Sequence, residues 1–412
     1  MNFFPIVYRL FFFLVDVATK PFSFCLPHPF SDRRKAHPPN HLPSGQWIWI
    51  QAVSLGELLL VPPLVKKILE KKIHIHITTS TTAGCDLLDT LLRTTLNHDL
   101  VSGGFFPLDL ESSLKPWINA KPKFLILMET ELWPNLIRLC KKNNISIGIV
   151  NGRLTFKSTR WIQGLTTNSL SQIDFVVARD HDSKVLFKSL GAPEVHYGGN
   201  LKAANILPEP LHKPWQDLNL LWTAQPIWVI GNTISGEEIL ILNLWKKQKE
   251  IQPNLRCILA PRQPKRFDEV EELLKSFHLA YTRASYWKTN SQRIPEDILL
   301  LDTVGDLPNL YQLAEFAFIG GGWLGRGGHN PLESLRYGVR TFVGPHYDNF
   351  KDLVIPLLRT ESLWALPVHE LEAQIKNLPV LISRDLKPSL KAVFEEFGAA
   401  LDRTWKVLEP RI

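Results

Sequence analysis

Cysteine is scarce in this sequence, which has four in 412 residues: Cys25, Cys85, Cys140 and Cys257. They lie far apart and include no Cys-x-x-Cys pair, so the usual zinc-binding spacings are absent. Isolated thiols are typical of proteins in a reducing compartment, where disulfides rarely form. We therefore expect four free cysteines and no metal site.

A clean membrane-spanning run is also absent. The one strongly hydrophobic stretch, Phe3–Ala18, contains Arg9 and Asp16, and both charges would be costly at the centre of a bilayer. A comfortable span needs about 20 apolar residues, and no small-residue cleavage site of a signal peptide follows. The basic run Arg33–Lys35 comes next, on the side expected to stay cytoplasmic. We expect residues 1–20 to form a membrane anchor or an interfacial helix; the alternative is a buried first helix of the domain.

The loop after the first expected strand of the second half, Gly231–Glu238, lacks two common nucleotide-binding spacings. It has neither the Gly-x-Gly-x-x-Gly spacing of dinucleotide-binding proteins nor that of the phosphate-binding loop of ATPases, which disfavours NAD and ATP as ligands. No aromatic–basic repeat occurs either, so nucleic acid is not an expected partner despite a net charge of +7. A mildly basic protein suits other anions, such as phospholipid headgroups and nucleotides.

What the sequence does contain is an alternation of short apolar runs and helical patterns, which predicts parallel sheets covered by helices on both faces. In the first half the expected strands are Trp47–Val53, His74–Thr79, Phe124–Met128, Ile145–Val150 and Asp174–Ala178. In the second half they are Ile227–Ile230, Arg256–Ala260, Ile298–Leu301, Phe316–Ile319 and Arg340–Val343. Helices are expected between them, including one from Glu57 to Lys72, and a final helix at Lys387–Val407.

The alternation stops between Asn205 and Trp222, where three prolines oppose regular structure. With 45% hydrophobic residues, the chain is long enough for two domains of about 200 residues each. We predict an α/β protein with two Rossmann-like domains facing each other across a cleft, at 45–204 and 223–385, joined by a linker at 205–222 and followed by a C-terminal helix at 386–412. Ligands of such sheets bind beyond the carboxyl ends of the strands.

Acidic residues follow two of the expected strands in the first half. Glu57 comes after the first strand and after Gly56, which permits a tight turn; its alternative role is to cap the next helix. Glu129 and Glu131 leave a buried strand in the same way. Like charges that converge on one sheet edge cost stability and usually serve a function. Lys202, near the end of the first domain, could face an anionic group or be a solvated surface charge.

Glycine-rich loops follow strands in the second half. One of them, Gly231–Glu238, opens a helix and could offer backbone N–H groups to a phosphate. Arg262 follows the next strand and could bind phosphate or carboxylate through paired hydrogen bonds. A second loop, 320–333, places Glu333 where its carboxylate could accept hydrogen bonds from a ribose diol, whereas His329 has no nearby metal-ligand partner. These features indicate a nucleotide-sugar site.

Seven motifs, taken in order, carry a resemblance to a known family. They are SLGE (54–57), METELWPN (128–135), NGR (151–153), GNLK (199–202), GNTISGEE (231–238), PRQPKRF (261–267) and GGHNPLE (327–333). Their order resembles that of the Kdo transferases, which move 3-deoxy-D-manno-octulosonic acid (Kdo) from CMP-Kdo onto lipid A precursors. The resemblance runs from about residue 47 to residue 350, and the hydrophobic N-terminal segment is similar too.

The resemblance implies a GT-B architecture and an inverting transfer of Kdo from CMP-Kdo to a tetraacyl lipid A precursor. It also implies a place on the cytoplasmic face of the inner membrane, and no cofactor or metal. Glu57 resembles the general base, and Glu131 and Lys202 occupy the positions of transition-state stabilisation. The segments that resemble the CMP-binding ones contain Pro261, Arg262, Gly305, Asp306, Leu307, Asn330, Pro331, Leu332 and Glu333.

Three departures from the family pattern stand out. Gln263 replaces the usual histidine, Asn232 replaces serine or threonine, and the pair 203–204 is Ala-Ala where Phe-Asp is common. Two other functions stay open at this stage: a GT-B enzyme that uses a UDP-sugar, and a non-catalytic nucleotide-sugar-binding or membrane scaffold protein. The METELWPN block argues against the first, and the presence of Glu57 and Glu131 argues against the second.

Overall fold

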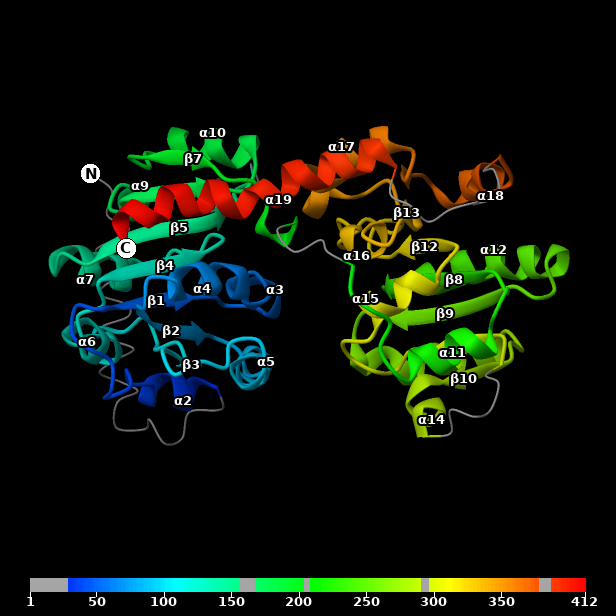
Figure 1. Cartoon of the computed structure of the whole chain (residues 1–412), viewed down its shortest axis with the longest axis horizontal. Helices are drawn as coiled ribbons and strands as arrows, with labels where there is room; N and C mark the ends of the chain where they lie inside the picture. The colour runs from blue at the N-terminus through cyan, green and yellow to red at the C-terminus, as the bar shows by residue number, and fades with distance from the viewer. Residues whose placement is uncertain (1–28, 156–166, 204–207, 290–295, 378–386) are drawn as a thin grey trace. The chain divides into compact units, whose positions relative to one another are not determined.

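The computed structural model describes residues 29–155, 167–203, 208–289, 296–377 and 387–412. The chain divides into two compact units (Figure 1). The first unit contains the chain up to Asn205 together with Phe397–Ile412, and the second unit contains Ile206–Glu396.

The first unit is built on a sheet of seven parallel strands in the order β3-β2-β1-β4-β5-β6-β7. The strands are β1 (Trp47–Gln51), β2 (His74–Thr79), β3 (Val101–Phe105), β4 (Phe124–Met128), β5 (Ser146–Gly152), β6 (Phe175–Ala178) and β7 (Val195–Tyr197). Its helices are α2 (Phe30–Lys35), α3 (Leu55–Leu58), α4 (Val61–Leu69), α5 (Thr82–Arg93), α6 (Glu111–Asn119), α7 (Pro134–Lys142), α9 (Thr167–Leu170), α10 (His181–Ser189) and the short η2 (Leu201–Ala203).

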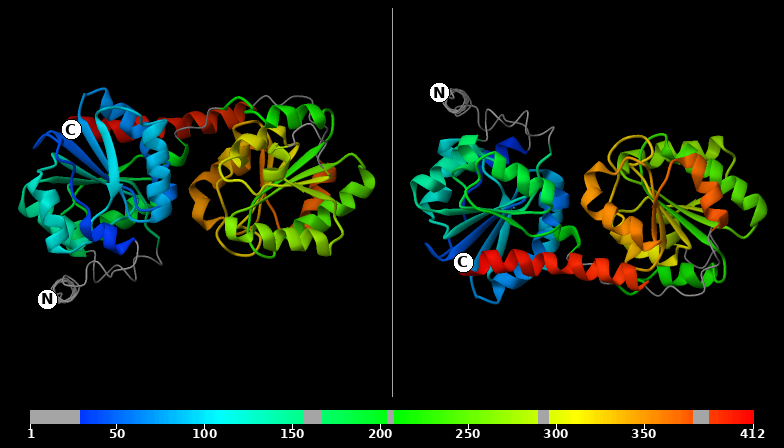
Figure 2. Two further views of the ribbon diagram at one scale, coloured as in Figure 1. Left: turned by 90° about the horizontal axis from the view of Figure 1, so that it is seen from below. Right: turned by 90° about the horizontal axis from the view of Figure 1, so that it is seen from above.

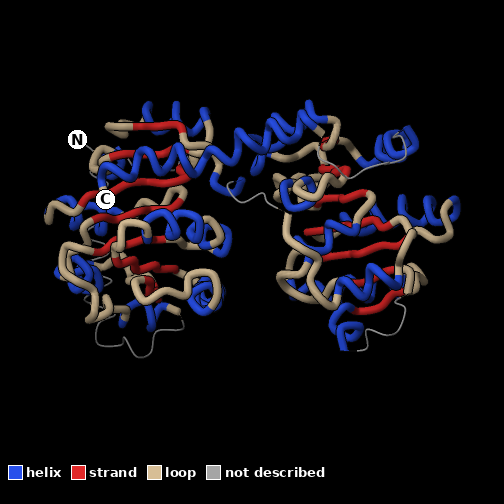
Figure 3. The backbone as a smooth tube through the Cα atoms, in the orientation of Figure 1, coloured by secondary structure: helices blue, strands red, loops and turns tan. Residues whose placement is uncertain are grey.

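Alternate residues of each central strand enter the two hydrophobic layers of this unit. Trp47 and Trp49 of β1 pack in the layer that contains residues of α6, α7 and α10. Ile48 and Ile50 pack in the other layer, which contains residues of α4 and α5. This period of two places helices on both faces of the sheet, as Figures 2 and 3 show.

The second unit repeats this plan with a parallel sheet in the order β10-β11-β9-β8-β12-β13-β14. The strands are β8 (Ile227–Thr233), β9 (Arg256–Pro261), β10 (Tyr281–Arg283), β11 (Ile298–Leu300), β12 (Phe316–Ile319), β13 (Arg340–Val343) and β14 (Leu363–Ala365). The helices are α11 (Trp215–Leu221), α12 (Glu237–Ile251), η3 (Pro264–Arg266), α13 (Phe267–Ser276), α14 (Ala284–Thr289), α15 (Leu307–Leu310), η4 (Tyr311–Leu313), α16 (Leu332–Leu335), η5 (Asp348–Phe350), α17 (Lys351–Leu357), η6 (Leu358–Thr360) and α18 (Val368–Asn377). The last elements of the chain are α19 (Pro388–Leu408), which begins in the second unit and ends in the first, and η7 (Glu409–Arg411).

In both sheets the strand order reverses at the first strand of the unit, between β1 and β4 in the first unit and between β8 and β12 in the second. In open parallel sheets ligands bind beyond the carboxyl ends of the strands at such a place. Glu57 follows β1 and Glu129 follows β4, while the two glycine-rich loops follow β8 and β12. The predicted α/β class with parallel sheets is confirmed, and the fold places the acidic motifs and the glycine-rich motifs at these two points.

The helix predicted from Glu57 to Lys72 is divided in two. α3 ends at Leu58, and α4 begins at Val61 with Pro62 and Pro63 in its first turn. Proline lacks the N–H that would continue the preceding helix, but the first turn of a new helix does not need that donor.

The segment predicted as an irregular linker contains a helix, α11, so that expectation was wrong for this part. Pro214 is the residue before the first helical residue, where its missing N–H costs nothing. Trp215 of α11 is buried, its ring stacks on that of Trp287 at 5.8 Å, and Leu218 is buried as well. This helix is therefore part of the second unit.

The predicted C-terminal helix is present as α19, and its final part packs on the first unit. Ala400, Trp405 and Leu408 join the hydrophobic layer that contains β1 residues Ile48 and Ile50. The first unit is thus completed by residues from the end of the chain.

The predicted N-terminal anchor, residues 1–20, lies outside the described residues. Among the helices that are described, none combines the length and the apolar character needed to cross a bilayer. Arg33, of the basic run that follows this segment, is 8% exposed, and its Nε donates to the carbonyl of Phe106 at 3.1 Å. It is therefore a buried cation of the first unit.

Gly148 of β5 provides a test of strand packing. It pairs in register with Phe175 of β6, and a Cβ at position 148 would overlap the Phe175 ring. We expect Gly148→Ala to lower the free energy of unfolding by about 1–3 kcal/mol, measured by denaturant titration. Gly104→Ala in β3, where a Cβ meets no atom within 4 Å, is the matched control and should be close to neutral. Equal effects of the two substitutions would contradict this reading.

Candidate active site

Glu57 lies at the carboxyl edge of the first sheet with both carboxylate oxygens engaged. Its Oε2 accepts from the backbone N–H of Val53 at 2.8 Å, and its Oε1 accepts from the Ser54 hydroxyl at 2.8 Å. Ser54 in turn accepts from the Glu57 N–H at 3.3 Å and caps α3. Glu57 thus takes part in the capping of α3, which was its alternative role, and the hydrogen bonds with Ser54 also fix its carboxylate.

The surroundings of Glu57 act on its pKa in opposite directions. Burial, which leaves the residue 7% exposed, raises the pKa, and the negative charge of Glu129 raises it further. The hydrogen bonds from Val53 and Ser54 favour the anion and lower the pKa, but the net direction is upward. A carboxylate with a raised pKa is a stronger base than one in water.

Glu129 leaves β4 in a left-handed backbone conformation, with φ of 53°. Its backbone N–H still bonds to the Val150 carbonyl of β5 at 2.9 Å, so its position is fixed by the sheet. Its Oε1 lies 3.3 Å from Nζ of Lys202. Glu129 therefore neutralises this lysine at the same edge of the sheet.

Glu131 is the most perturbed of the three carboxylates. Burial first, and then the charges of Glu57 and Glu129, raise its pKa to about 8, and the charge of Arg33 opposes them. The negative charges of both Glu57 and Glu129 therefore act on the Glu131 carboxyl group. At neutral pH the Glu131 carboxyl group is mostly protonated and can donate a hydrogen bond.

The resemblance paired the roles of Glu131 and Lys202, whereas the ion pair in the structure joins Lys202 to Glu129. The sequence showed that Glu129 directly follows β4, which ends at Met128, but did not indicate a role for it.

The segment that carries Lys202 is held by two asparagines. Asn151, buried and with φ of 57°, accepts the Leu201 N–H at 2.9 Å. Asn200 accepts the Lys202 N–H at 3.0 Å. Asparagine tolerates the left-handed conformation better than most residues. The NGR and GNLK motifs are therefore one structural feature that positions the lysine.

In the second unit, Arg262, His329 and Glu333 come together. Burial raises the pKa of Glu333 to about 7, and the charges of Arg336 and Arg262 counteract it. Burial together with the charge of Arg262 lowers the pKa of His329 to about 4, so this imidazole is neutral at pH 7. Arg262 itself is exposed. One exposed cation beside a half-buried carboxyl group can bind an anion that also carries hydroxyl groups.

The residues around Glu333 have mainly backbone roles. Asn330 accepts the Leu332 N–H at 3.1 Å, and Pro331 precedes the first residue of α16. Pro261 is the last residue of β9, directly before Arg262.

In the predicted segment Gly305-Asp306-Leu307, the Asp306 carboxylate is occupied by hydrogen bonds from within the second unit. Burial raises the pKa of Asp306, but hydrogen bonds from Lys288 (2.6 Å), Thr303 (2.6 Å) and Trp215 (3.1 Å) outweigh it, and the pKa lies below its usual value. These bonds tie α11 and α14 to the start of α15. Asp306 therefore has a structural task, and a contact of this segment with a nucleotide would come from its backbone or from Leu307.

The glycine-rich loop 231–238 was expected to offer free amide groups to phosphate. In the structure Glu237, fully buried, accepts the N–H groups of Ile234 (3.2 Å), Gly321 (2.7 Å) and Trp323 (2.9 Å). Its carboxylate joins the two glycine-rich loops and occupies these donors. Within loop 231–238 itself, the Ile234 N–H is taken by this carboxylate and the Glu237 N–H by the Ile234 carbonyl, so these two amides are not available to a phosphate.

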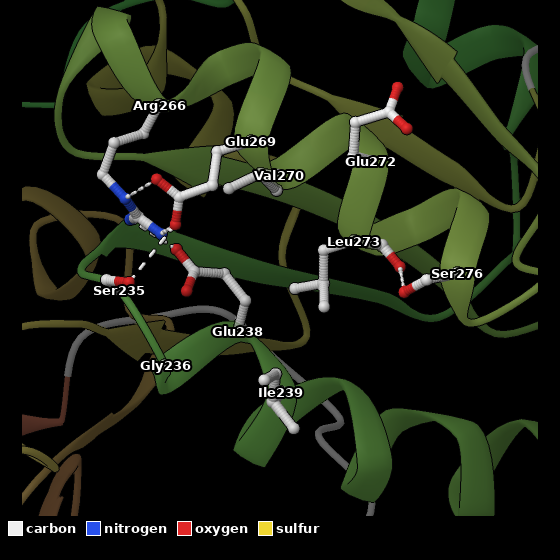
Figure 4. Close-up of a pocket in the computed structure, with 10 residues that line it drawn as sticks. All are labelled: Ser235, Gly236, Glu238, Ile239, Arg266, Glu269, Val270, Glu272, Leu273 and Ser276. Carbon is white, nitrogen blue, oxygen red and sulfur yellow. Dashed lines mark hydrogen bonds and ion pairs between the residues drawn. The ribbon is translucent and has the colours of Figure 1, made fainter.

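In a pocket between the starts of α12 and α13, acidic residues again occupy the groups that could bind a phosphate (Figure 4). Its arginine, Arg266, bonds to Glu238 at 2.7 Å and to Glu269 at 3.0 Å, and Ser235 donates to Glu269 at 3.2 Å. Glu272 adds another carboxylate to the lining. The carboxylates outnumber the cation, so this pocket is unsuited to a phosphate.

Cys85, Cys140 and Cys257 have free thiols. Within the described part of the chain, His, Cys, Asp and Glu side chains form no group of three that could hold a metal ion.

Solved structures with a similar fold are nucleotide-sugar proteins. The UDP-GlcNAc 2-epimerase of Neisseria meningitidis bound to UDP-GlcNAc superposes with a TM-score of 0.54 at 11% identity, over 88% of this chain and 98% of that one. Anabaena Alr3699/HepE in complex with UDP-glucose gives a TM-score of 0.58 at 13% identity, over 89% and 99%. At such identities the similarity shows the fold, which is GT-B-like.

Sequence relatives define the family within that fold. The family model of 3-deoxy-D-manno-octulosonic-acid transferase (kdotransferase) matches residues 28–205. The 3-deoxy-D-manno-octulosonic acid transferase of Haemophilus influenzae is 32% identical over 333 residues, 78% of this chain and 76% of the relative. The Bordetella pertussis enzyme of the same name is 29% identical over 341 residues, 77% and 78% of the two chains. The chain belongs to the Kdo transferase family and is a glycosyltransferase, as its motifs indicated.

The pKa of Glu131 predicts how stability depends on pH. The folded protein keeps the Glu131 proton up to about pH 8, whereas the unfolded chain loses it near the ordinary pKa of 4.5. The contribution of Glu131 to the free energy of unfolding therefore falls as the pH rises from 4.5 to about 8. Glu131→Gln removes the effect. The variant should gain stability over the natural protein by a margin that grows from pH 5 to pH 8, measured by denaturant unfolding. The exposed Glu70→Gln is the control, and a margin that does not vary with pH would contradict the prediction.

Proposed function

We propose that this protein transfers Kdo from CMP-Kdo to a tetraacyl lipid A precursor in lipopolysaccharide synthesis, with inversion at the anomeric carbon and with Glu57 as the general base. The observation that carries the proposal is the fixed carboxylate of Glu57, at the reversal of the first sheet, beside two further carboxyl groups and a lysine. Membership of the Kdo transferase family supports the sugar.

The reaction would proceed in one displacement. Glu57 removes the proton from the acceptor hydroxyl, and the hydroxyl oxygen forms a bond to the anomeric carbon of Kdo. The bond from that carbon to the phosphate oxygen breaks, and CMP leaves with the electron pair. A general base contributes about 10²–10⁴-fold to such a step. The fixed Oε2–Val53 contact leaves the base no need to reorient before it acts.

Lys202 and Glu131 would stabilise the negative charges of the donor and of the transition state during transfer. Kdo is itself a carboxylate, and a cation such as Lys202 can stabilise it. Glu131, protonated at neutral pH, can donate a hydrogen bond to an oxygen that gains negative charge. Glu129 keeps the lysine in place through the 3.3 Å ion pair.

CMP would be held in the second unit by Arg262 and Glu333. The arginine is exposed and can pair with the phosphate, which also stabilises it as a leaving group. The Glu333 carboxyl group can accept hydrogen bonds from the ribose hydroxyls. No metal or cofactor is required by this scheme.

The acceptor is a lipid, so we propose that the protein works at the cytoplasmic face of the inner membrane, with the hydrophobic N-terminal segment as its anchor. The net charge of +7 supports contact with anionic headgroups.

The test of the base is Glu57→Gln. Glutamine can still accept the Val53 N–H but cannot take a proton, so turnover of CMP-Kdo with the lipid acceptor should fall by about two to four orders of magnitude. CMP affinity should stay unchanged, because the proposed CMP residues lie in the other unit. Glu111→Gln, an exposed acid in the first turn of α6, is the matched control for a purely helix-capping role. A stable Glu57→Gln enzyme with a normal single-turnover rate would sink the assignment.

The test of the donor site is Glu333→Gln. An ionised carboxylate accepts hydrogen bonds from a diol more strongly than an amide does, so CMP affinity should fall by about 10-fold or more at pH 8. Because the pKa of Glu333 is about 7, the difference between the two proteins should be smaller at pH 6. Calorimetry at both pH values measures this, with Glu250→Gln on the exposed side of α12 as the control. UDP, which should bind more weakly than CMP, tests the base specificity. Identical CMP affinities at pH 8 would remove Glu333 from the site.

A further inference from the structure

The position of Glu57 depends on a short exposed loop. Ser54, Leu55 and Gly56 are all exposed, and β1 ends at Gln51. Two backbone N–H groups act on the Glu57 carboxylate: that of Val53, at 2.8 Å from Oε2, has the larger effect, and that of Ser54 has a smaller one. The placement of the carboxylate therefore depends on Val53, so the residue that fixes Val53 matters for the chemistry.

Val53 is fixed by Thr79, the last residue of β2. The Thr79 hydroxyl donates to the Val53 carbonyl at 3.0 Å. Thr79 is fully buried, and its own carbonyl accepts the Phe106 N–H at 2.7 Å beyond the end of β3. The hydrogen bond between Thr79 and Val53 extends the pairing of β1 with β2 beyond the last residue of β1. In the same stretch the Ala52 N–H donates to the Thr78 carbonyl at 2.9 Å.

The first turn of α5 is shaped to admit this hydroxyl. A Cβ on Gly84 would overlap Oγ1 of Thr79 and would come within 2.8 Å of Oγ1 of Thr81. Thr81 caps α5 by accepting the Gly84 N–H at 3.0 Å. The absence of a side chain at position 84 thus leaves room for the Thr79 hydroxyl to point at Val53.

We propose that Thr79 is a positioning residue for Glu57: its hydroxyl holds the Val53 carbonyl, Val53 holds the Glu57 carboxylate, and Gly84 provides the space that this arrangement needs. Thr79 does not touch the substrate in this scheme. The inference rests on the proposed role of Glu57 as the base.

The neighbouring Thr78 offers a matched control. It is equally buried, it lies next to Thr79 in the same strand, and its side chain points to the opposite face of the sheet. Its hydroxyl accepts from Trp49 Nε1 at 2.8 Å and donates to Gln51 at 2.5 Å, and neither bond involves Val53 or Glu57. Removing either hydroxyl should cost stability, but only the loss at position 79 should affect catalysis.

The experiment compares Thr79→Val, Thr79→Ser and Thr78→Val in the full-length protein, with CMP-Kdo and a detergent-dispersed tetraacyl acceptor. Thr79→Val keeps the shape and loses the donor, and kcat should fall by about 10- to 100-fold with little change in the KM for CMP-Kdo. Thr79→Ser restores the hydroxyl and should recover most of kcat. Thr78→Val should lower the melting temperature with kcat retained. If Thr79→Val does not fold, Gly84→Ala, which displaces the hydroxyl without removing it, should lower kcat in its place.

A double substitution separates this inference from the proposed function. In a Glu57→Gln background, Thr79→Val should cause no further loss of kcat, because the group that it positions is already inactive. A large loss for Glu57→Gln with normal kcat in both Thr79→Val and Gly84→Ala would overturn the role of Thr79 alone. An equal loss of kcat in Thr78→Val would also overturn it, since the effect would then be general loosening of the core. A normal rate for Glu57→Gln would instead overturn the proposed base.

Discussion

Three carboxyl groups, one buried and two partly buried, lie at the end of one sheet, where their charges disfavour one another, and the first unit is arranged to accommodate them. Each carboxyl group is stabilised there in a different way. Glu57 is held by the N–H of Val53, Glu129 is paired with the ammonium of Lys202, and Glu131 keeps its proton. Such differentiation lets one small region contain a base, a cation and an acid at the same pH.

The second unit uses its acidic residues for a different purpose. Glu237 joins the two glycine-rich loops, and Asp306 ties neighbouring helices together, so both carboxylates are consumed by internal hydrogen bonds. Arg266 is likewise neutralised by Glu238. Arg262 remains exposed beside the half-buried Glu333. Arg262 is therefore not neutralised in the way that Arg266 is, and it is the cation that we propose binds the phosphate of CMP.

Much of this could be predicted from the sequence, because strands buried on both faces are apolar throughout. Phe124–Met128 is such a strand, and the acids that follow it were recognised with it. β3 (Val101–Phe105) was missed since two of its five residues are glycines; Gly103 is needed because a Cβ there would lie 2.8 Å from Leu88 of α5. The pairing of Lys202 with Glu129 was also missed. It depends on a left-handed backbone at position 129, and no single-residue pattern announces that conformation.

The return of the C-terminal helix to the first unit has a consequence for biosynthesis. Ala400, Trp405 and Leu408 fill the hydrophobic layer under β1 and β4, and Arg403 donates to the Gly198 carbonyl at 2.8 Å. The other buried residues of that layer, up to Leu201, precede the second unit in the chain, whereas these three follow it. The layer can therefore be completed only after the second unit has been translated.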